Sequence, residues 1–145
     1  MNVWMTNVRS FQLSDYAPVT QLLEEVLSDE CCEETLEAFG RQLSWDSELI
    51  LVATSGPQVV GVIIGTIDGD KGYYYRTAVA KSYQRKGIGR ALIQGLKKRF
   101  EQRKVSRVLI SVDDYNAKVL PFYESLGYGQ PELQRPAREL SIVCG

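Results

Sequence analysis

Apolar residues recur along the chain with two different periods, one typical of helices and one typical of strands. The helical period is clearest at Ile88, Leu92, Leu96 and Phe100, which would share one face of a helix that runs to about Arg103. Further helices are expected after an N-cap at Ser14, over Glu33 to Leu43, and after an N-cap at Asn116.

Runs rich in valine, isoleucine, threonine and aromatic residues alternate with these helices and predict strands. A Ser-Gly-Pro sequence between two of the runs is typical of a hairpin turn. The expected strands are Val3 to Gln12, Leu49 to Thr54, Gln58 to Asp68, Tyr73 to Val79, Val105 to Val112 and Ala137 to Val143.

The segment from Gln84 to Arg90 joins a strand to a helix and contains two glycines and three cations. Cations at the positive N-terminal end of a helix are unfavourable unless an anion binds there. Gly87 and Gly89 leave the backbone N–H groups open, and Gly87 can adopt a positive φ without steric cost. The segment therefore predicts a pyrophosphate site, whereas the competing interpretation is a tight turn with solvated cations.

Two common phosphate-binding motifs fit this segment poorly. No Gly-Lys-Ser/Thr sequence is present, so the metal-binding hydroxyl of a P-loop is missing. In a dinucleotide fingerprint Leu92 would stand where close packing requires glycine or alanine. About twenty residues further on, where such a fold needs an acid for the ribose, the chain reads Val105, Ser106 and Arg107. A Rossmann-type nucleotide binder is therefore a third choice.

Two motifs together resemble those of the GNAT superfamily of acyl-CoA-dependent N-acyltransferases. Gln84, Gly87 and Gly89 match its signature of Gln or Arg, two residues, Gly, one residue, and Gly or Ala. The resemblance covers nearly the whole chain and implies an α/β (α+β) fold: a mixed, mostly antiparallel central sheet flanked by about four helices, in a single domain over residues 1–145. The second motif is matched by Asn116, Phe122, Tyr123, Glu124, Leu126, Gly127 and Tyr128.

The resemblance implies that acetyl-CoA donates an acetyl group directly to a primary amine in a ternary complex. It implies that the main chain of Ala78, Val79 and Ala80 bonds the pantetheine arm and that Asn116 contacts the coenzyme besides capping a helix. Tyr123 is expected to protonate the leaving thiolate as general acid, although a core aromatic is the competing interpretation. The residues expected to hold the pyrophosphate are Gln84, Arg85, Lys86, Gly87, Ile88, Gly89 and Arg90.

The general base is less well defined, because the strand Tyr73 to Val79 contains no carboxylate. Asp113 and Asp114, at the end of the following strand, are the nearest candidates, and an ordinary polar strand end competes with that role. Asp68, Glu48 and a water relay to a backbone carbonyl are alternatives.

Alternation along the strand Tyr73 to Val79 predicts which side chains share a face. We expect Tyr73, Tyr75 and Thr77 on one face, and Tyr74 and Arg76 on the other. Arg76 either binds a carboxylate of the acceptor or pairs with an acid across the sheet. One of the two faces is a candidate wall of the acceptor pocket.

Amino-acid composition narrows the classes of fold and chemistry that remain. The chain has 145 residues, 44% of them hydrophobic, which suits one core. It has no histidine, so imidazole metal sites and Ser-His or Cys-His nucleophile pairs are excluded, and no metal is expected. Cys31, Cys32 and Cys144 are expected to be free thiols, because their spacing suits neither a metal site nor a disulfide framework.

A formal net charge of −1 argues against nucleic acid or an anionic membrane as partner. The N-terminus resembles no signal peptide and no apolar run is long enough to span a bilayer, so a cytoplasmic protein is expected. The expected partner is an amine-bearing small molecule, protein or peptide, with a homodimer as an option. The alternative function is a non-catalytic acyl-CoA-binding or sensing module of the same fold.

Overall fold

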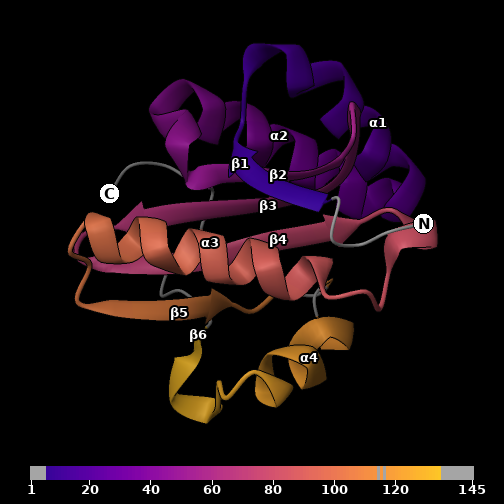
Figure 1. The fold of residues 1–145 in the computed structure, drawn as a ribbon. Coiled ribbons are helices and arrows are strands. Elements are labelled where there is room, and N and C mark those ends of the chain that lie inside the picture. The colour runs from indigo at the N-terminus through magenta and orange to yellow at the C-terminus, as the bar shows by residue number, and fades with distance from the viewer. Residues whose placement is uncertain (1–5, 114, 116, 135–145) are drawn as a thin grey trace.

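The computed structural model describes residues 6–113, 115 and 117–134. In this part of the chain six strands form one sheet in the order β1-β2-β3-β4-β5-β6, and three of the five strand pairings are antiparallel (Figure 1). The strands are β1 (Thr6–Ser10), β2 (Ile50–Ser55), β3 (Gln58–Asp68), β4 (Lys71–Val79), β5 (Arg107–Ser111) and β6 (Leu133–Gln134). The helices are α1 (Tyr16–Val26), α2 (Asp29–Asp46), α3 (Ile88–Gln102) and α4 (Leu120–Ser125).

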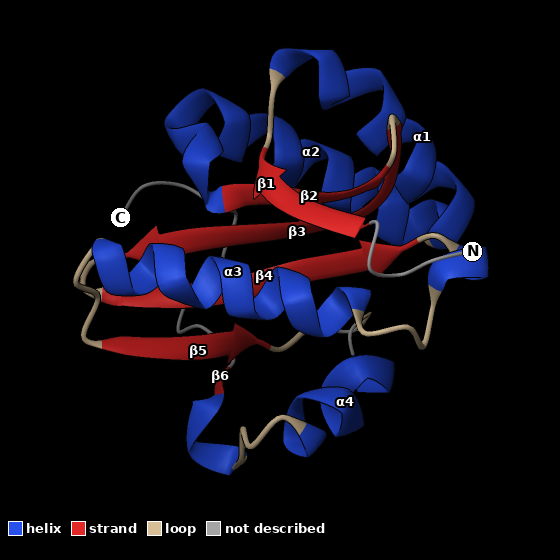
Figure 2. Ribbon diagram, in the orientation of Figure 1, coloured by secondary structure: helices blue, strands red, loops and turns tan. Residues whose placement is uncertain are grey.

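Helices cover both faces of the sheet (Figure 2). The apolar face of α3 packs on one side, where Leu92, Leu96 and Phe100 join a buried cluster with side chains of β2, β3 and β4. Helices α1 and α2 pack on the other side, where Leu23 and Phe39 belong to a second buried cluster. The predicted mixed, mostly antiparallel sheet with about four helices is confirmed.

Helix α3 lies unusually close to the sheet. A Cβ atom on Gly65 would come within 2.6 Å of Leu96 Cδ2, and one on Gly72 within 2.8 Å of the Phe100 ring. Neither position has room for a side chain, so both glycines are required by packing. This close approach fixes the C-terminal half of α3 against β3 and β4.

The pairing of β4 with its neighbours changes partway along the strand. The register runs Ile64↔Arg76 and then Gly65↔Tyr74, so Tyr75 is an extra residue in β4, a β-bulge. On its other edge β4 pairs with β5 only from Lys71 to Tyr74. The second half of β4 therefore has one edge that β5 does not cover.

Several predicted boundaries need correction. Ser14 is not a helix cap: a 3₁₀ turn precedes α1, and Asp15 in that turn accepts bonds from Arg9 at 2.7 and 2.9 Å. Helix α2 is longer than predicted at both ends and begins after Ser28, whose side chain accepts the Cys31 N–H. Helix α4 begins late, with Pro121 in its first turn, as a residue lacking an N–H requires. The predicted strand over residues 137–143 lies outside the described residues.

Within the part of the chain that the structure describes, no helix is both long and apolar enough to cross a membrane.

Candidate active site

A cleft of about 750 Å³ opens where the end of β4, the start of α3 and helix α4 meet the α1–α2 junction. Figure 1 shows α4 beside the N-terminal end of α3, and the Phe122 ring lies 3.4 Å from where a Cβ on Gly89 would be. The cleft is lined by Val26, Leu27, Ser28, Cys31, Thr77, Ala78, Val79, Tyr83, Gln84, Arg85, Gly87, Gly89, Arg90, Tyr115, Lys118, Val119, Phe122 and Tyr123.

The glycine-rich turn is held in an unusual backbone conformation. Gly87 has φ +85° and is the N-cap of α3, and Arg85 also has a positive φ, of +61°. The side chain of Gln84 donates to the Val79 carbonyl at 3.0 Å and thereby ties the turn to the end of β4. Because Gly87 has no side chain to cap the helix, the first N–H groups of α3 remain available to an anion.

Most residues predicted to bind pyrophosphate line the cleft, but two do not. Gln84, Arg85, Gly87, Gly89 and Arg90 are part of its wall. Ile88 is instead a core side chain that is 2% exposed, and the Lys86 ammonium lies 5.9 Å from the centre of the Tyr83 ring. Helical geometry explains this, since neighbouring residues in a turn point in different directions.

Main-chain groups of β4 face the cleft at alternate residues. The Ala80 N–H donates to the Val60 carbonyl at 2.8 Å, so Ala80 forms a hydrogen-bonded pair with β3. In an antiparallel ladder such pairs alternate with pairs that are not hydrogen-bonded. The main-chain N–H and C=O of Ala78 therefore point towards β3, whereas those of Thr77 and Val79 point to the opposite edge of β4. The expectation that Ala78 and Ala80 present main-chain groups to a ligand therefore needs correction in favour of Thr77 and Val79.

Tyr123 lies at the cleft wall and is only 3% exposed. Its ring is stacked with Tyr74 and meets Tyr128 edge-on, with centroid distances of 5.9 and 6.0 Å. Its hydroxyl is 3.5 Å from the Thr77 hydroxyl. Burial raises the pKa of Tyr123 to about 12, and the contact with Thr77 partly opposes this rise. The phenol therefore stays protonated at neutral pH, as a general acid requires.

Of the carboxylates predicted as general base, Asp113, Asp68 and Glu48 are not in the cleft wall. Asp113 accepts two bonds from the Arg76 guanidinium, at 3.0 and 3.2 Å, and one from the Tyr115 N–H. Glu48 pairs with Arg103 at 3.1 Å. Asp68 ends β3 and is absent from the cleft lining, and among the described residues that line the cleft none is acidic. Asp114 and Asn116 lie outside the described residues.

Arg76 is buried, with 5% exposure. Tyr74 and Arg76 were expected to share a face of β4, but they lie on opposite faces. Tyr74 packs towards α3 against Phe100, whereas Arg76 donates to the Thr35 hydroxyl on α2 at 3.0 Å. The bulge at Tyr75 interrupts the alternation of side chains and causes this difference. The prediction that Arg76 pairs with an acid across the sheet is confirmed at Asp113, although the pair is not on the surface.

Several cleft residues have no place in the two sequence motifs. Cys31, a free and buried thiol, comes from the first turn of α2. Tyr115 and Lys118 come from the segment that leads into α4, and Phe122, which belongs to the second motif, follows them within α4. Tyr115, Lys118 and Phe122 are three and four residues apart, and Val119 and Tyr123 are four apart. This helical period is a signal in the sequence that could have predicted this side of the cleft.

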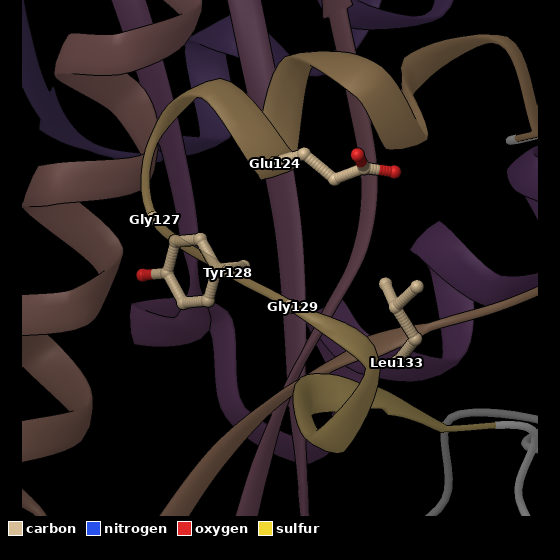
Figure 3. Close-up of a pocket in the computed structure, with 5 residues that line it drawn as sticks. All are labelled: Glu124, Gly127, Tyr128, Gly129 and Leu133. Carbon is tan, nitrogen blue, oxygen red and sulfur yellow. The ribbon is translucent and has the colours of Figure 1, made fainter.

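A second, smaller hollow of about 430 Å³ lies beside the turn that follows α4 (Figure 3). It is lined by Glu124, Gly127, Tyr128, Gly129 and Leu133. It contains no residue predicted to bind the coenzyme or to act as acid or base. Tyr128 links it to the main site, because its ring meets that of Tyr123 edge-on and its N–H donates to the Tyr123 carbonyl at 3.1 Å, while its hydroxyl is 2.9 Å from that of Tyr74.

Comparison with known proteins agrees with the geometry. Similar solved structures include the ribosomal-protein-S18-alanine N-acetyltransferase of Escherichia coli, with 23% identity, a TM-score of 0.67 and coverage of 86% of this chain and 78% of that one. The PaiA N-acetyltransferase of Thermoplasma acidophilum in complex with coenzyme A has 18% identity, a TM-score of 0.68 and coverage of 86% and 89%. The NatC complex bound to Gag peptide and CoA has 18% identity, a TM-score of 0.66 and coverage of 83% and 82%. The family model described as the acetyltransferase (GNAT) family matches residues 17–128, so this chain belongs to the GNAT acetyltransferase family.

Proposed function

We propose that this protein is an N-acetyltransferase that moves the acetyl group of acetyl-CoA directly to a primary amine through a ternary complex. The observation that supports this most strongly is one cleft in which an open helix N-terminus, an uncovered strand edge and a buried, protonated phenol meet. We also propose that residues 1–145 form one domain and that the protein acts in the cytoplasm.

The cleft fits the parts of a coenzyme A molecule. Arg85, Arg90 and Lys118 supply positive charge, and a Cβ added at Gly87 would meet nothing within 4 Å, so the backbone there is accessible to phosphate oxygens. The main-chain groups of Thr77 and Val79 on the uncovered edge of β4 suit the amides of a pantetheine arm, which would add to the sheet like a strand. By family resemblance Asn116 would add a further contact.

Tyr123 is assigned the role of general acid. The amine nitrogen forms a bond to the thioester carbonyl carbon, the carbon–sulfur bond breaks, and the phenol gives its proton to the departing sulfur. The proton that the nitrogen loses as the amide forms then restores the phenol. A pKa of about 12 keeps this proton on the phenol at neutral pH, so that it is available where negative charge develops on the departing sulfur. Burial of the ring fixes the position of the hydroxyl.

The amine must lose a proton before it attacks, because a free alkyl ammonium has a pKa near 10.4. Of the two candidate bases, Asp113 is disfavoured as a proton acceptor because it accepts two bonds from Arg76, and Asp114 lies outside the described residues. We therefore propose that water carries this proton to bulk solvent. Alignment of amine and thioester in the cleft would supply much of the rate acceleration.

The second candidate function is a CoA-binding module without turnover, and the lack of an acidic residue among the described lining residues is the observation that favours it. Thiol release from acetyl-CoA over a panel of primary amines, with the product identified by mass spectrometry, separates the two. Turnover that Tyr123→Phe strongly reduces supports the enzyme. Binding of acetyl-CoA without turnover on any amine supports the module.

A further inference from the structure

The cleft reaches both faces of the sheet at the end of β4. Val79 packs against the buried cluster on the α3 side, Ala78 belongs to the cluster on the side of α1 and α2, and both residues line the cleft. The groups proposed to hold the coenzyme and to protonate its sulfur, the turn at the start of α3 and Tyr123, lie on the α3 side. The part of the cleft left for an acceptor is therefore the part on the side of α1 and α2.

Helices α1 and α2 give that part of the cleft a mainly apolar wall. Val26 ends α1 and Leu27 is its C-cap, and both are only partly buried, so they leave apolar surface open to the cleft. Ser28 is a polar member of the wall, and its hydroxyl already accepts the Cys31 N–H. We call the following lining residues the apolar wall: Val26, Leu27, Ser28, Cys31 and Ala78. An apolar group that covered this surface would remove it from water and be stabilised there.

None of the described residues of the apolar wall is charged, and the charge behind it is positive. The Cys31 sulfur is 3.8 Å from the Thr35 hydroxyl, to which the Arg76 guanidinium donates at 3.0 Å. Burial raises the pKa of the Cys31 thiol, and among the charges that act on this thiol, that of Arg76, which opposes the rise, has the largest effect. A second ammonium on the acceptor would therefore be disfavoured at this wall.

The buried guanidinium does not offer a carboxylate site either. Arg76 is 5% exposed, and both of its terminal nitrogens donate to Asp113, at 3.0 and 3.2 Å, while the inner nitrogen donates to Thr35. A charge that is bonded in this way within the protein has few donors left for a ligand. Apolar contact is therefore the recognition that the wall can provide.

We propose, on the basis of the acetyltransferase function above, that the acceptor is a primary amine with an apolar, uncharged substituent, and that this substituent packs on the apolar wall. Leu27 is a specificity-determining residue for it. Alkylamines, arylalkylamines and peptide N-termini with an apolar first side chain belong to this class, whereas diamines do not.

The first experiment compares amines of matched length in steady-state assays of thiol release from acetyl-CoA. Hexylamine and 1,5-diaminopentane have the same shape and differ in a terminal methyl or ammonium group. We expect kcat/KM to favour hexylamine by about tenfold or more. From ethylamine to hexylamine, kcat/KM should rise about fourfold for each methylene that the wall covers.

Two variants at the start of α2 test where the substituent lies. Aspartate and asparagine can both cap a helix, as Ser28 does, and they are nearly equal in size. Ser28→Asp adds one negative charge to the apolar wall, whereas Ser28→Asn adds none. Relative to Ser28→Asn, Ser28→Asp should shift the ratio of kcat/KM about tenfold towards 1,5-diaminopentane.

A second pair of variants tests the role of Leu27. Leu27→Ala removes apolar surface from the wall, so the gain from ethylamine to hexylamine should fall by about tenfold. Leu13→Ala is the matched control, because Leu13 is 86% exposed and is not part of the cleft lining, and it should leave the gain unchanged. Both variants should bind acetyl-CoA as the wild type does, and this titration also confirms that they are folded.

The possible outcomes are distinct. Turnover with equal or higher kcat/KM for 1,5-diaminopentane overturns the inference and leaves the acetyltransferase function standing. Equal ratios in Ser28→Asp and Ser28→Asn overturn the placement of the substituent on this wall. Weaker binding of acetyl-CoA by Leu27→Ala, with unchanged amine selectivity, overturns it as well and assigns the wall to the coenzyme. Absence of turnover on every amine, despite binding of acetyl-CoA, overturns the proposed function and the inference with it.

Discussion

Replacement of Tyr123 by phenylalanine removes one oxygen atom and should separate catalysis from stability. The phenylalanine ring retains the stacking on Tyr74 and the edge-on contact with Tyr128. The only hydrogen bond recorded for the Tyr123 hydroxyl within the described structure is the long one of 3.5 Å to Thr77. Loss of a bond at the outer limit of hydrogen-bonding distance should cost about 0.5 kcal/mol or less of unfolding free energy.

The effect on rate should be far larger. A positioned general acid contributes about 10²- to 10⁴-fold, so kcat of Tyr123→Phe should fall by that factor. The affinity for acetyl-CoA should change little, because the hydroxyl acts at the thioester and not on the phosphates. Because burial raises the pKa of Tyr123 to about 12, the wild-type rate should show no loss from deprotonation of this phenol below about pH 11.

Tyr128→Phe is the matched control. It also removes one phenolic oxygen from the same aromatic cluster, but that hydroxyl pairs with Tyr74, at 2.9 Å. Tyr74 is fully buried, so its hydroxyl would lose its partner at a cost of about 1 to 3 kcal/mol. The control should therefore lower Tm by about 3 to 9 °C and leave kcat within a fewfold of wild type.

The assays are thiol release for kcat, calorimetric titration for acetyl-CoA affinity and thermal unfolding for Tm. A kcat for Tyr123→Phe within threefold of wild type would refute the assignment of the general acid. Equal losses of kcat in the two variants would mean that the aromatic cluster acts through packing alone.

Three further predictions concern charge and packing. Asp15→Asn should lower the unfolding free energy by about 1 to 3 kcal/mol at pH 7, because the bond with its arginine partner on β1 lowers the pKa of Asp15. In the wild type this stabilisation is present above the unfolded pKa, near 3.9, and is lost as pH falls through the lower folded value, so urea unfolding of the two proteins should converge in acid. Gly72→Ala should cost about 1 to 3 kcal/mol in the same assay, since its Cβ would lie 2.8 Å from a ring on α3, and an unchanged midpoint would contradict that packing. Arg90→Ala should weaken acetyl-CoA binding more at low salt than at high salt, whereas Lys86→Ala, outside the cleft wall, should have little effect in the same titration.

Much of the fold could be predicted from the sequence because its signals are local. The strand Gln58 to Asp68 has the predicted bounds, and the apolar positions of α3 form one buried face. The positive φ expected at Gly87 is present. These features depend on side-chain period and glycine chemistry, which neighbouring residues determine.

The details that shape the candidate site depend on contacts between distant segments. The bulge at Tyr75 results from the register of β4 against β3, which alternation along one strand cannot reveal. Burial of Arg76 requires Glu34 and Thr35 from α2 and Asp113 after β5, which are far apart in the sequence. The sequence therefore predicted the glycine-rich side of the candidate site more fully than the side that α2 and the segment after β5 contribute.

The most direct test of the central claim is calorimetric titration of the protein with acetyl-CoA, with NADH and ATP as control ligands, repeated on Gly87→Glu and Gly56→Glu. Both glycines have a positive φ and open space around them, so a glutamate should introduce a similar backbone strain of about 1 to 2 kcal/mol at either position. Gly56 is the control because it lies in the β2–β3 turn and not in the cleft wall. We predict selective binding of acetyl-CoA by the wild type and by Gly56→Glu, and loss of binding in Gly87→Glu. Failure of the folded wild type to bind acetyl-CoA, or unchanged affinity in Gly87→Glu, would contradict the account.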